Sequence, residues 1–225
     1  MITLIYKEIE KSISGRIEFM VFYNRIENLV RFYNFSQNNY EDYIKDKRKE
    51  LKDFEKEIEN RENRTINEEY LGEYTFTEYE MTITIKDELY GIERDFLEFQ
   101  KMIFIILCYS EMEKLFDNFV DIHIGKNVRF KNLKEKILRL NNDLQVDLTE
   151  LINSLDPLRQ IRNYLVHQYD YWDSEILIKK KETHQKIKDI KNLNDEMLSN
   201  ILNLIIEKII EFEIEYDKKM SIIND

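Results

Sequence analysis

Apolar residues recur at spacings of three and four along most of the chain, which is the period of an amphipathic helix. This pattern predicts a helix over residues 4–35, interrupted near Gly15. A second, exposed helix is expected over residues 41–62, where dense Lys and Glu surround a few apolar anchors. Because the chain holds only one proline and four glycines, long helices are favoured over a β architecture with many turns.

One segment departs from the helical pattern. In residues 74–85, Thr and aromatic side chains alternate with other residues, which predicts a strand or a short β-hairpin. A soft boundary follows at residues 86–92. The expected organisation is therefore an N-terminal helical extension over residues 1–90 and a helical domain over residues 91–225.

The second domain contains the strongest helix signals. Helices are expected over residues 96–122, 131–140, 148–155, 157–170 and 195–216. Gly125 is a natural end for the first of them. Asp156-Pro157 reads as a helix start, because Asp caps free backbone N–H groups and proline fits the first helical position. The predicted fold class is mainly α, an up-and-down helical bundle.

Composition narrows the choice of function. Hydrophobic residues make up 43% of the chain, enough for a packed core, and charged residues make up 35%. The net charge of −11 is unlike that of a protein that coats nucleic acid. An enzyme that meets RNA at a small site needs only a local basic patch, so RNA stays a candidate substrate.

The chain has one cysteine, Cys108, so an intrachain disulfide is excluded and a zinc site would lack thiolates. No phosphate-binding glycine loop or paired-carboxylate metal motif stands out, and neither a metal nor a cofactor is expected. The first residues lack the pattern of a signal peptide, and the longest apolar run, 102–108, is too short to cross a membrane. A cytoplasmic protein without a membrane partner is expected.

The candidate chemistry lies on the helix expected after Pro157. At about 100° per residue, one face is apolar, and the opposite face forms a polar strip. The apolar face carries Leu158, Ile161, Leu165 and Trp172. The polar strip carries Arg159, Arg162, Asn163, Val166, His167 and Asp170.

These side chains suit a phosphodiester. A guanidinium offers a fork of donors to phosphate oxygens, and an imidazole can move protons near neutral pH. RNA brings its own nucleophile, the 2′-hydroxyl, so that such a site can cleave RNA without a metal.

The spacing of Arg162 and His167 bears on assembly. Five residues separate them, so they point about 140° apart on one helix and do not converge. A two-fold homodimer would bring the strip against its copy and form a shared site. Val166, between them on the strip, is the expected contact residue.

Arg162-x4-His167, with Asn163 directly after the arginine, resembles the signature of the HEPN superfamily. Those are small α-helical domains, often dimeric, many of which are ribonucleases in toxin–antitoxin, abortive-infection and other antiviral systems. Tyr169 extends the match to Arg-x4-His-x-Tyr, which looks like the HepT toxin subgroup. There the antitoxin is a minimal nucleotidyltransferase that adenylylates the motif tyrosine.

The resemblance implies roles for individual residues. Arg162 and His167 would be catalytic together with Asn163, which supports the site, and Tyr169 would be a modification target. Ser110-Glu111-Met112-Glu113 is similar to a Ser-x-x-Glu motif of many HEPN domains, which makes Glu113 an acid that pairs with Arg162 or orients His167. Neighbouring residues would support the site: Arg159 and Asp170.

Several alternatives stay open at this point. The basic run that includes Lys179, Lys180 and Lys181 is either a solvated connector or an arm that holds RNA backbone. The expected function is a metal-independent endoribonuclease that acts as a toxin or antiviral effector. The other readings are a non-catalytic HEPN-like RNA-binding module and a plain protein-interaction module.

Overall fold

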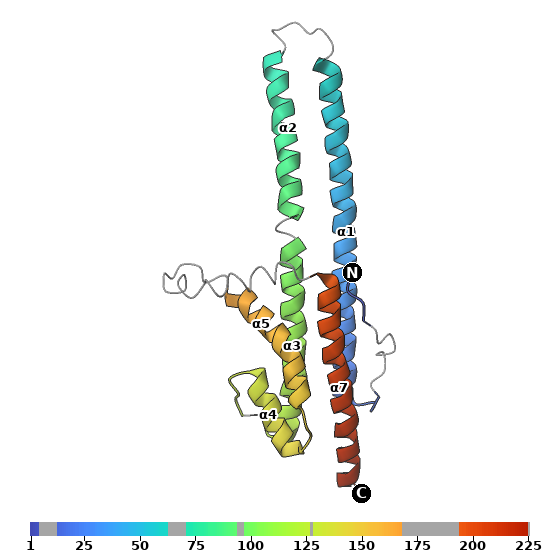
Figure 1. The fold of residues 1–225 in the computed structure, drawn as a ribbon, viewed down its shortest axis with the longest axis vertical. Helices are drawn as coiled ribbons and strands as arrows, with labels where there is room; N and C mark the ends of the chain where they lie inside the picture. The colour runs from blue at the N-terminus through green and yellow to red at the C-terminus, as the bar shows by residue number, and fades with distance from the viewer. Residues whose placement is uncertain (5–12, 63–70, 94–96, 127, 168–193, 225) are drawn as a thin grey trace, which may run out of the picture. The chain divides into compact units, whose positions relative to one another are not determined.

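The computed structural model describes residues 1–4, 13–62, 71–93, 97–126, 128–167 and 194–224. Among these residues the regular elements are all helices, and no strand is present. The helices are α1 (Ile17–Glu62), α2 (Leu71–Gly91), α3 (Leu97–His123), α4 (Leu133–Leu144), α5 (Thr149–His167) and α7 (Asp195–Asn224) (Figure 1). The mainly α-helical fold class predicted from the sequence is confirmed.

The chain forms two compact units. Unit 1 combines Met1–Tyr33 with Met102–Asp225, and unit 2 consists of Asn34–Lys101. The sequence pattern places a boundary near residue 90, whereas the contacts group the first 33 residues with the C-terminal helices. Helices α1 and α3 each belong to both units, because each continues across a unit boundary without a break.

Aromatic side chains form the centre of the unit 1 core. Phe19 of α1 lies 5.1 Å from Phe119 of α3 and 5.6 Å from Phe212 of α7, measured between ring centroids. Phe116 stacks on Phe212 at 5.9 Å. The shorter helices α4 and α5 add the buried residues Ile137, Leu140, Leu151, Leu155 and Leu158. Burial of this many large apolar side chains is the main stabilising term of the unit.

A buried carboxylate fastens the start of the chain to α7. Glu213 is fully buried and accepts hydrogen bonds from the backbone N–H and hydroxyl of Ser14, at 2.8 and 2.6 Å, and from the Tyr23 hydroxyl at 2.8 Å. Gly15 follows with a φ of 69°, a left-handed conformation that glycine adopts without strain. Helix α1 then begins at Ile17, two residues after Gly15, while residues 5–12 of the helix expected over 4–35 lie outside the described set.

The strand or β-hairpin predicted for residues 74–85 is wrong, since the segment lies inside α2. β-propensity is a preference for a pleated, half-buried surface, and packing overrides it here. Ile85 and Leu89, one helical turn apart, are buried in unit 2 together with Ile44 of α1.

The helix start predicted at Asp156-Pro157 is also wrong. Helix α5 begins at Thr149 and continues through Pro157. The signal of its true start is Asp147, whose carboxylate accepts a hydrogen bond from the backbone N–H of Thr149 at 3.0 Å. Proline lacks an N–H and weakens the helix locally. The buried residues Leu151, Leu155 and Leu158 on both sides of it hold the two turns on one core face.

Of the other helix ends, that of α3 follows its predicted signal, and those of α4 and α7 carry caps that were not predicted. Helix α3 stops just before Gly125, whose φ is 126° and whose N–H bonds to the Val120 carbonyl at 2.9 Å. Asn132 caps α4 by accepting from the backbone N–H of Glu135 at 3.0 Å. Asn194 caps α7 in the same way at 2.8 Å. Among the described residues, no helix is long and apolar enough to cross a membrane.

Candidate functional site

Arg162 lies on α5 with its guanidinium held between two neighbours. The guanidinium carbon is 5.6 Å from the centroid of the Tyr109 ring of α3, within range of a cation–π contact. One guanidinium nitrogen donates a hydrogen bond to the Asn163 side-chain oxygen at 3.0 Å. The side chain of Arg162 is half-buried. These contacts restrict its rotamers while part of the donor fork remains accessible.

The pKa of Tyr109 depends on the charged residues that surround Arg162. Its side chain is buried, and burial raises the pKa of its hydroxyl; the nearby Glu113 carboxylate raises that pKa further. The positive charges of Arg162 and Arg159 act in the opposite direction. Two residues of α3 and two of α5 therefore share one electrostatic environment. No hydrogen bond or ion pair joins Glu113 to Arg162 among the described side chains.

Arg159, the other arginine of the polar strip, already has a carboxylate partner. Arg159 donates two hydrogen bonds to one carboxylate oxygen of Asp156, at 2.9 and 2.6 Å. The Gln160 amide donates to the other oxygen at 2.5 Å. These bonds from Arg159 and Gln160 lower the pKa of the Asp156 carboxyl. Arg162 differs, because in the described part of the chain it has no carboxylate partner.

The two faces predicted for this helix are present. Leu158, Ile161 and Leu165 are buried in the unit 1 core, while Arg162 and Asn163 are half-buried and Val166 is 39% exposed. An apolar side chain exposed to this degree on a polar strip is available for contact with a second molecule.

Part of the predicted site cannot be placed. His167 is the last residue of α5, and its side chain lies outside the described set. The remaining predicted residues lie outside the described part of the chain: Tyr169, Asp170, Lys179, Lys180 and Lys181. The structure thus groups Arg159, Arg162 and Asn163 with Glu113.

Sequence reasoning missed Tyr109, the ring beneath Arg162. Helical register could have found it, because Tyr109 and Glu113 are four residues apart and share a face of α3. Among the described residues, no group of three or more His, Cys, Asp or Glu side chains could hold a metal ion.

Comparison with protein-family models, with curated proteins and with solved structures finds no match to this chain.

Proposed function

We propose that this chain is a metal-independent endoribonuclease of the HEPN type, acting in the cytoplasm as a toxin or an abortive-infection effector. The observation that carries the proposal is the state of Arg162. Its guanidinium is half-buried, rests on an aromatic ring, bonds to a neutral amide and has no carboxylate partner among the described residues. A held cation of this kind favours an anionic ligand, and a phosphodiester matches its donor fork.

The proposed reaction uses the substrate's own nucleophile. The 2′-oxygen attacks phosphorus and loses its proton, the bond from phosphorus to the 5′-oxygen breaks, and that oxygen receives a proton. The products are a 2′,3′-cyclic phosphate and a free 5′-hydroxyl. Arg162 stabilises the charge on the phosphate oxygens, and His167 supplies or accepts one of the protons. Asn163 positions Arg162 through the hydrogen bond at 3.0 Å.

Two further features belong to the proposal. Residues Arg162 and His167 diverge on one helix, so the complete site would combine two copies of the chain across a two-fold axis, with Val166 at the contact. A cognate nucleotidyltransferase antitoxin would silence the enzyme by adenylylating Tyr169, or another defence-system component would control it. Glu113 would pair with Arg162 in the assembled site or orient His167.

The test is cleavage of single-stranded RNA in excess EDTA. Wild type should release 2′,3′-cyclic phosphate ends, while Arg162→Ala and His167→Ala should each lose about 100-fold or more of the rate. Arg139→Ala is the matched control, since Arg139 is an arginine of α4 that pairs with Asp143 at 3.0 Å. Equal activity in all four proteins would overturn the proposal. RNA binding without cleavage, surviving His167→Ala, would instead identify a non-catalytic binding module.

A further inference from the structure

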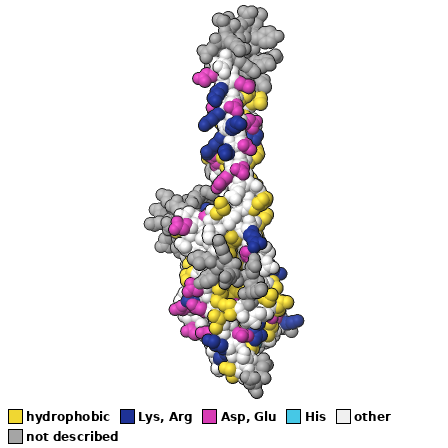
Figure 2. Space-filling model, turned by 90° about the vertical axis from the view of Figure 1, so that its right-hand side faces the viewer, with side chains coloured by type: hydrophobic (Ala, Val, Ile, Leu, Met, Phe, Trp, Pro, Cys, Tyr) yellow, Lys and Arg dark blue, Asp and Glu magenta, His cyan; other side chains and the backbone are white. Residues whose placement is uncertain are grey.

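Four lysines follow one face of α1 within unit 2. Lys45, Lys49, Lys52 and Lys56 are spaced by four, three and four residues, which places them in one row along a helix. All four side chains are exposed. Their span of eleven residues corresponds to about 16 Å along the helix axis. We call this row the lysine stripe; Figure 2 shows Lys and Arg side chains gathered along one flank of this part of the molecule.

Among the described side chains, the lysines of the stripe differ from Lys47, Arg48 and Lys86 in having no carboxylate partner. Lys47 pairs with Glu50 and Glu88, at 3.0 and 3.5 Å. Arg48 pairs with Glu93, and Lys86 with Glu55. For the four lysines of the stripe, no ion pair occurs among the described side chains. Their charges are therefore free to meet an external anion.

Acidic residues run beside the lysine stripe. Asp46, Glu50, Asp53 and Glu57 repeat the same spacing one position later, about 100° around the helix. Positive and negative side chains thus lie in two neighbouring rows and do not alternate along one row. An anion lying along the lysines meets the acidic row only at its edge.

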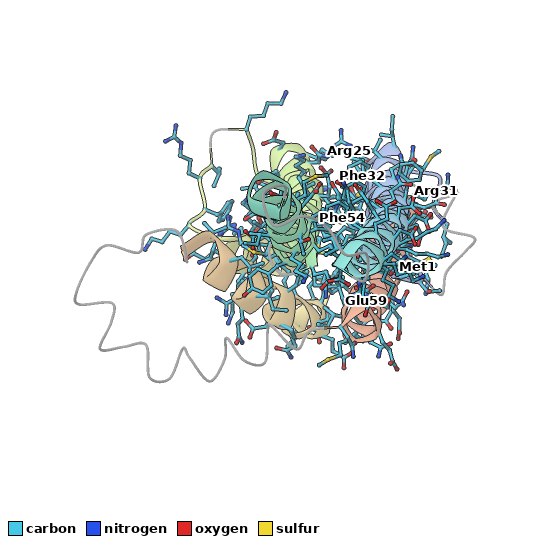
Figure 3. The ribbon with its side chains drawn as sticks, turned by 90° about the horizontal axis from the view of Figure 1, so that it is seen from above. Met1, Arg25, Arg31, Phe32, Phe54 and Glu59 are labelled. Atoms are coloured by element: carbon cyan, nitrogen blue, oxygen red, sulfur yellow. The ribbon has the colours of Figure 1, made fainter. Side chains whose placement is uncertain are left out.

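A shallow groove accompanies the first half of the stripe. It has a volume of about 690 Å³, and its lining combines four cations and Ile44 with three carboxylates: Lys45, Arg48, Lys49, Lys52, Ile44, Glu41, Asp46 and Glu93. Ile44 is buried, and the side chain of Phe54 lies on the side of α1 that faces α2 (Figure 3). Between Lys45 and Lys56 the apolar side chains Leu51 and Phe54 are half-buried, so the surface offers mainly charge and little apolar area to bury.

A protein partner would need apolar area, and a small anion would need a closed site. A row of exposed charges about 16 Å long suits a flexible chain of regularly spaced negative charges. We propose that the lysine stripe binds the phosphate backbone of single-stranded RNA without reading its sequence. The choice of RNA as the ligand rests on the proposed ribonuclease function. The proposal that the stripe binds a linear chain of phosphates does not depend on that function.

The test uses the full chain and a fluorescent single-stranded 2′-O-methyl RNA, which lacks the free 2′-hydroxyl and cannot be cleaved by the proposed reaction. Affinity is measured by anisotropy over a series of salt concentrations. The stripe variant changes Lys45, Lys49, Lys52 and Lys56 to Gln. The control variant makes the same change at four exposed lysines of unit 1: Lys126, Lys131, Lys134 and Lys218.

Loss of four phosphate contacts should make the slope of log K against log[salt] shallower by about 3, at about 0.7 per contact for a single strand. Affinity at low salt should fall at least tenfold, and the control should behave as wild type. If the stripe variant does not fold, the pairs Lys45/Lys49→Gln and Lys52/Lys56→Gln should each lower the slope by about half as much.

Unchanged slope and affinity in the stripe variant, or an equal loss in the control, would overturn the inference. Equally tight, stripe-dependent binding of polyglutamate would overturn the assignment to RNA. The two proposals fail separately. If RNA binding depends on the lysine stripe but the protein cleaves no RNA, only the proposed ribonuclease function is rejected. If the protein cleaves RNA but binding does not depend on the stripe, only the proposed role of the stripe is rejected.

Discussion

Units 1 and 2 are both helical, yet different forces hold them together. Unit 1 encloses one large apolar core to which α1, α3, α4, α5 and α7 all contribute. Among its described side chains, unit 2 has a small cluster of Ile44, Ile85 and Leu89, with Leu51 and Ile92 beside it. Ion pairs between exposed side chains supplement that cluster.

This difference between the two units shows that a helical period in the sequence does not by itself predict how stable the folded helices are. Burial of apolar surface scales with the area removed from water, whereas an exposed ion pair contributes little and is screened by salt. Unit 2 should therefore open under conditions that leave unit 1 folded. Each of the following changes tests that contrast, beginning with the largest expected effect.

Phe119→Ala should lower the free energy of unfolding of unit 1 by about 3–5 kcal/mol, because it leaves a cavity among Phe19, Phe212 and Tyr216. Urea unfolding followed by circular dichroism measures the change. Phe32→Ala is the control, since Phe32 is 66% exposed and should cost far less. Equal losses in the two variants would contradict the assigned core.

Glu213→Gln should cost unit 1 about 2–3 kcal/mol. The amide can accept only at one atom, and its NH₂ group would face the donors of Ser14 and Tyr23 that now meet the carboxylate. Thermal unfolding measures the loss against Glu215→Gln, a change at an exposed position of the same helix. A matching melting temperature for both variants would show that the three hydrogen bonds do not stabilise the fold.

Leu89→Ala should cost unit 2 about 2 kcal/mol, the low end for such a change, because its small cluster has little to lose. Hydrogen exchange should show faster exchange in residues 34–62 and 71–91, with the amides of α5 and α7 unaffected. Faster exchange throughout both units would mean that they unfold together and would remove the contrast.

Alkaline pH should weaken unit 1 through two buried tyrosines. Burial raises the pKa of Tyr23, as does Glu213, and burial and Asp195 raise that of Tyr33. The unfolded chain ionises these hydroxyls near pH 10 while the folded chain keeps its protons, so stability is present below that pH and is lost above it. The loss should approach about 1.4 kcal/mol per pH unit for each tyrosine. Tyr33→Phe should reduce the slope, and an unchanged slope would refute the cause.

Arg48→Ala should produce the smallest change, less than about 1 kcal/mol in unit 2, because its pair with Glu93 is exposed. Its effect on exchange should disappear at 1 M salt, where screening already removes the attraction. A loss that persists at high salt would indicate that Arg48 acts by packing.

The helices of the C-terminal part could be predicted because their apolar residues keep one period and Gly125 marks the end of α3, whereas the caps Asn132 and Asn194 were missed. The error over residues 74–85 arose because β-branched residues were read by propensity, while contact with Ile44 decides their conformation. The error at Pro157 arose because a cap signal is local, while the core face of α5 extends across it.

The candidate site could be predicted only along one helix. Phasing placed Arg162 and Val166 opposite Leu158 and Leu165, as the structure has them. It could not place Tyr109 under Arg162 or show that, among the described residues, Arg159 has a carboxylate partner and Arg162 has none, because those contacts depend on how α3 meets α5 and on local rotamers.

The division of unit 1 along the chain has a consequence for synthesis. Tyr23 of its first helix donates a hydrogen bond to Glu213, which lies 190 residues later, so the ribosome delivers the two halves of this core at different times. The helices of unit 2 are synthesised between these two halves, so they can pair before α7 is available to pack against α1. The half of the chain that carries Arg162 would then gain its packed surroundings only when α7 has left the exit tunnel.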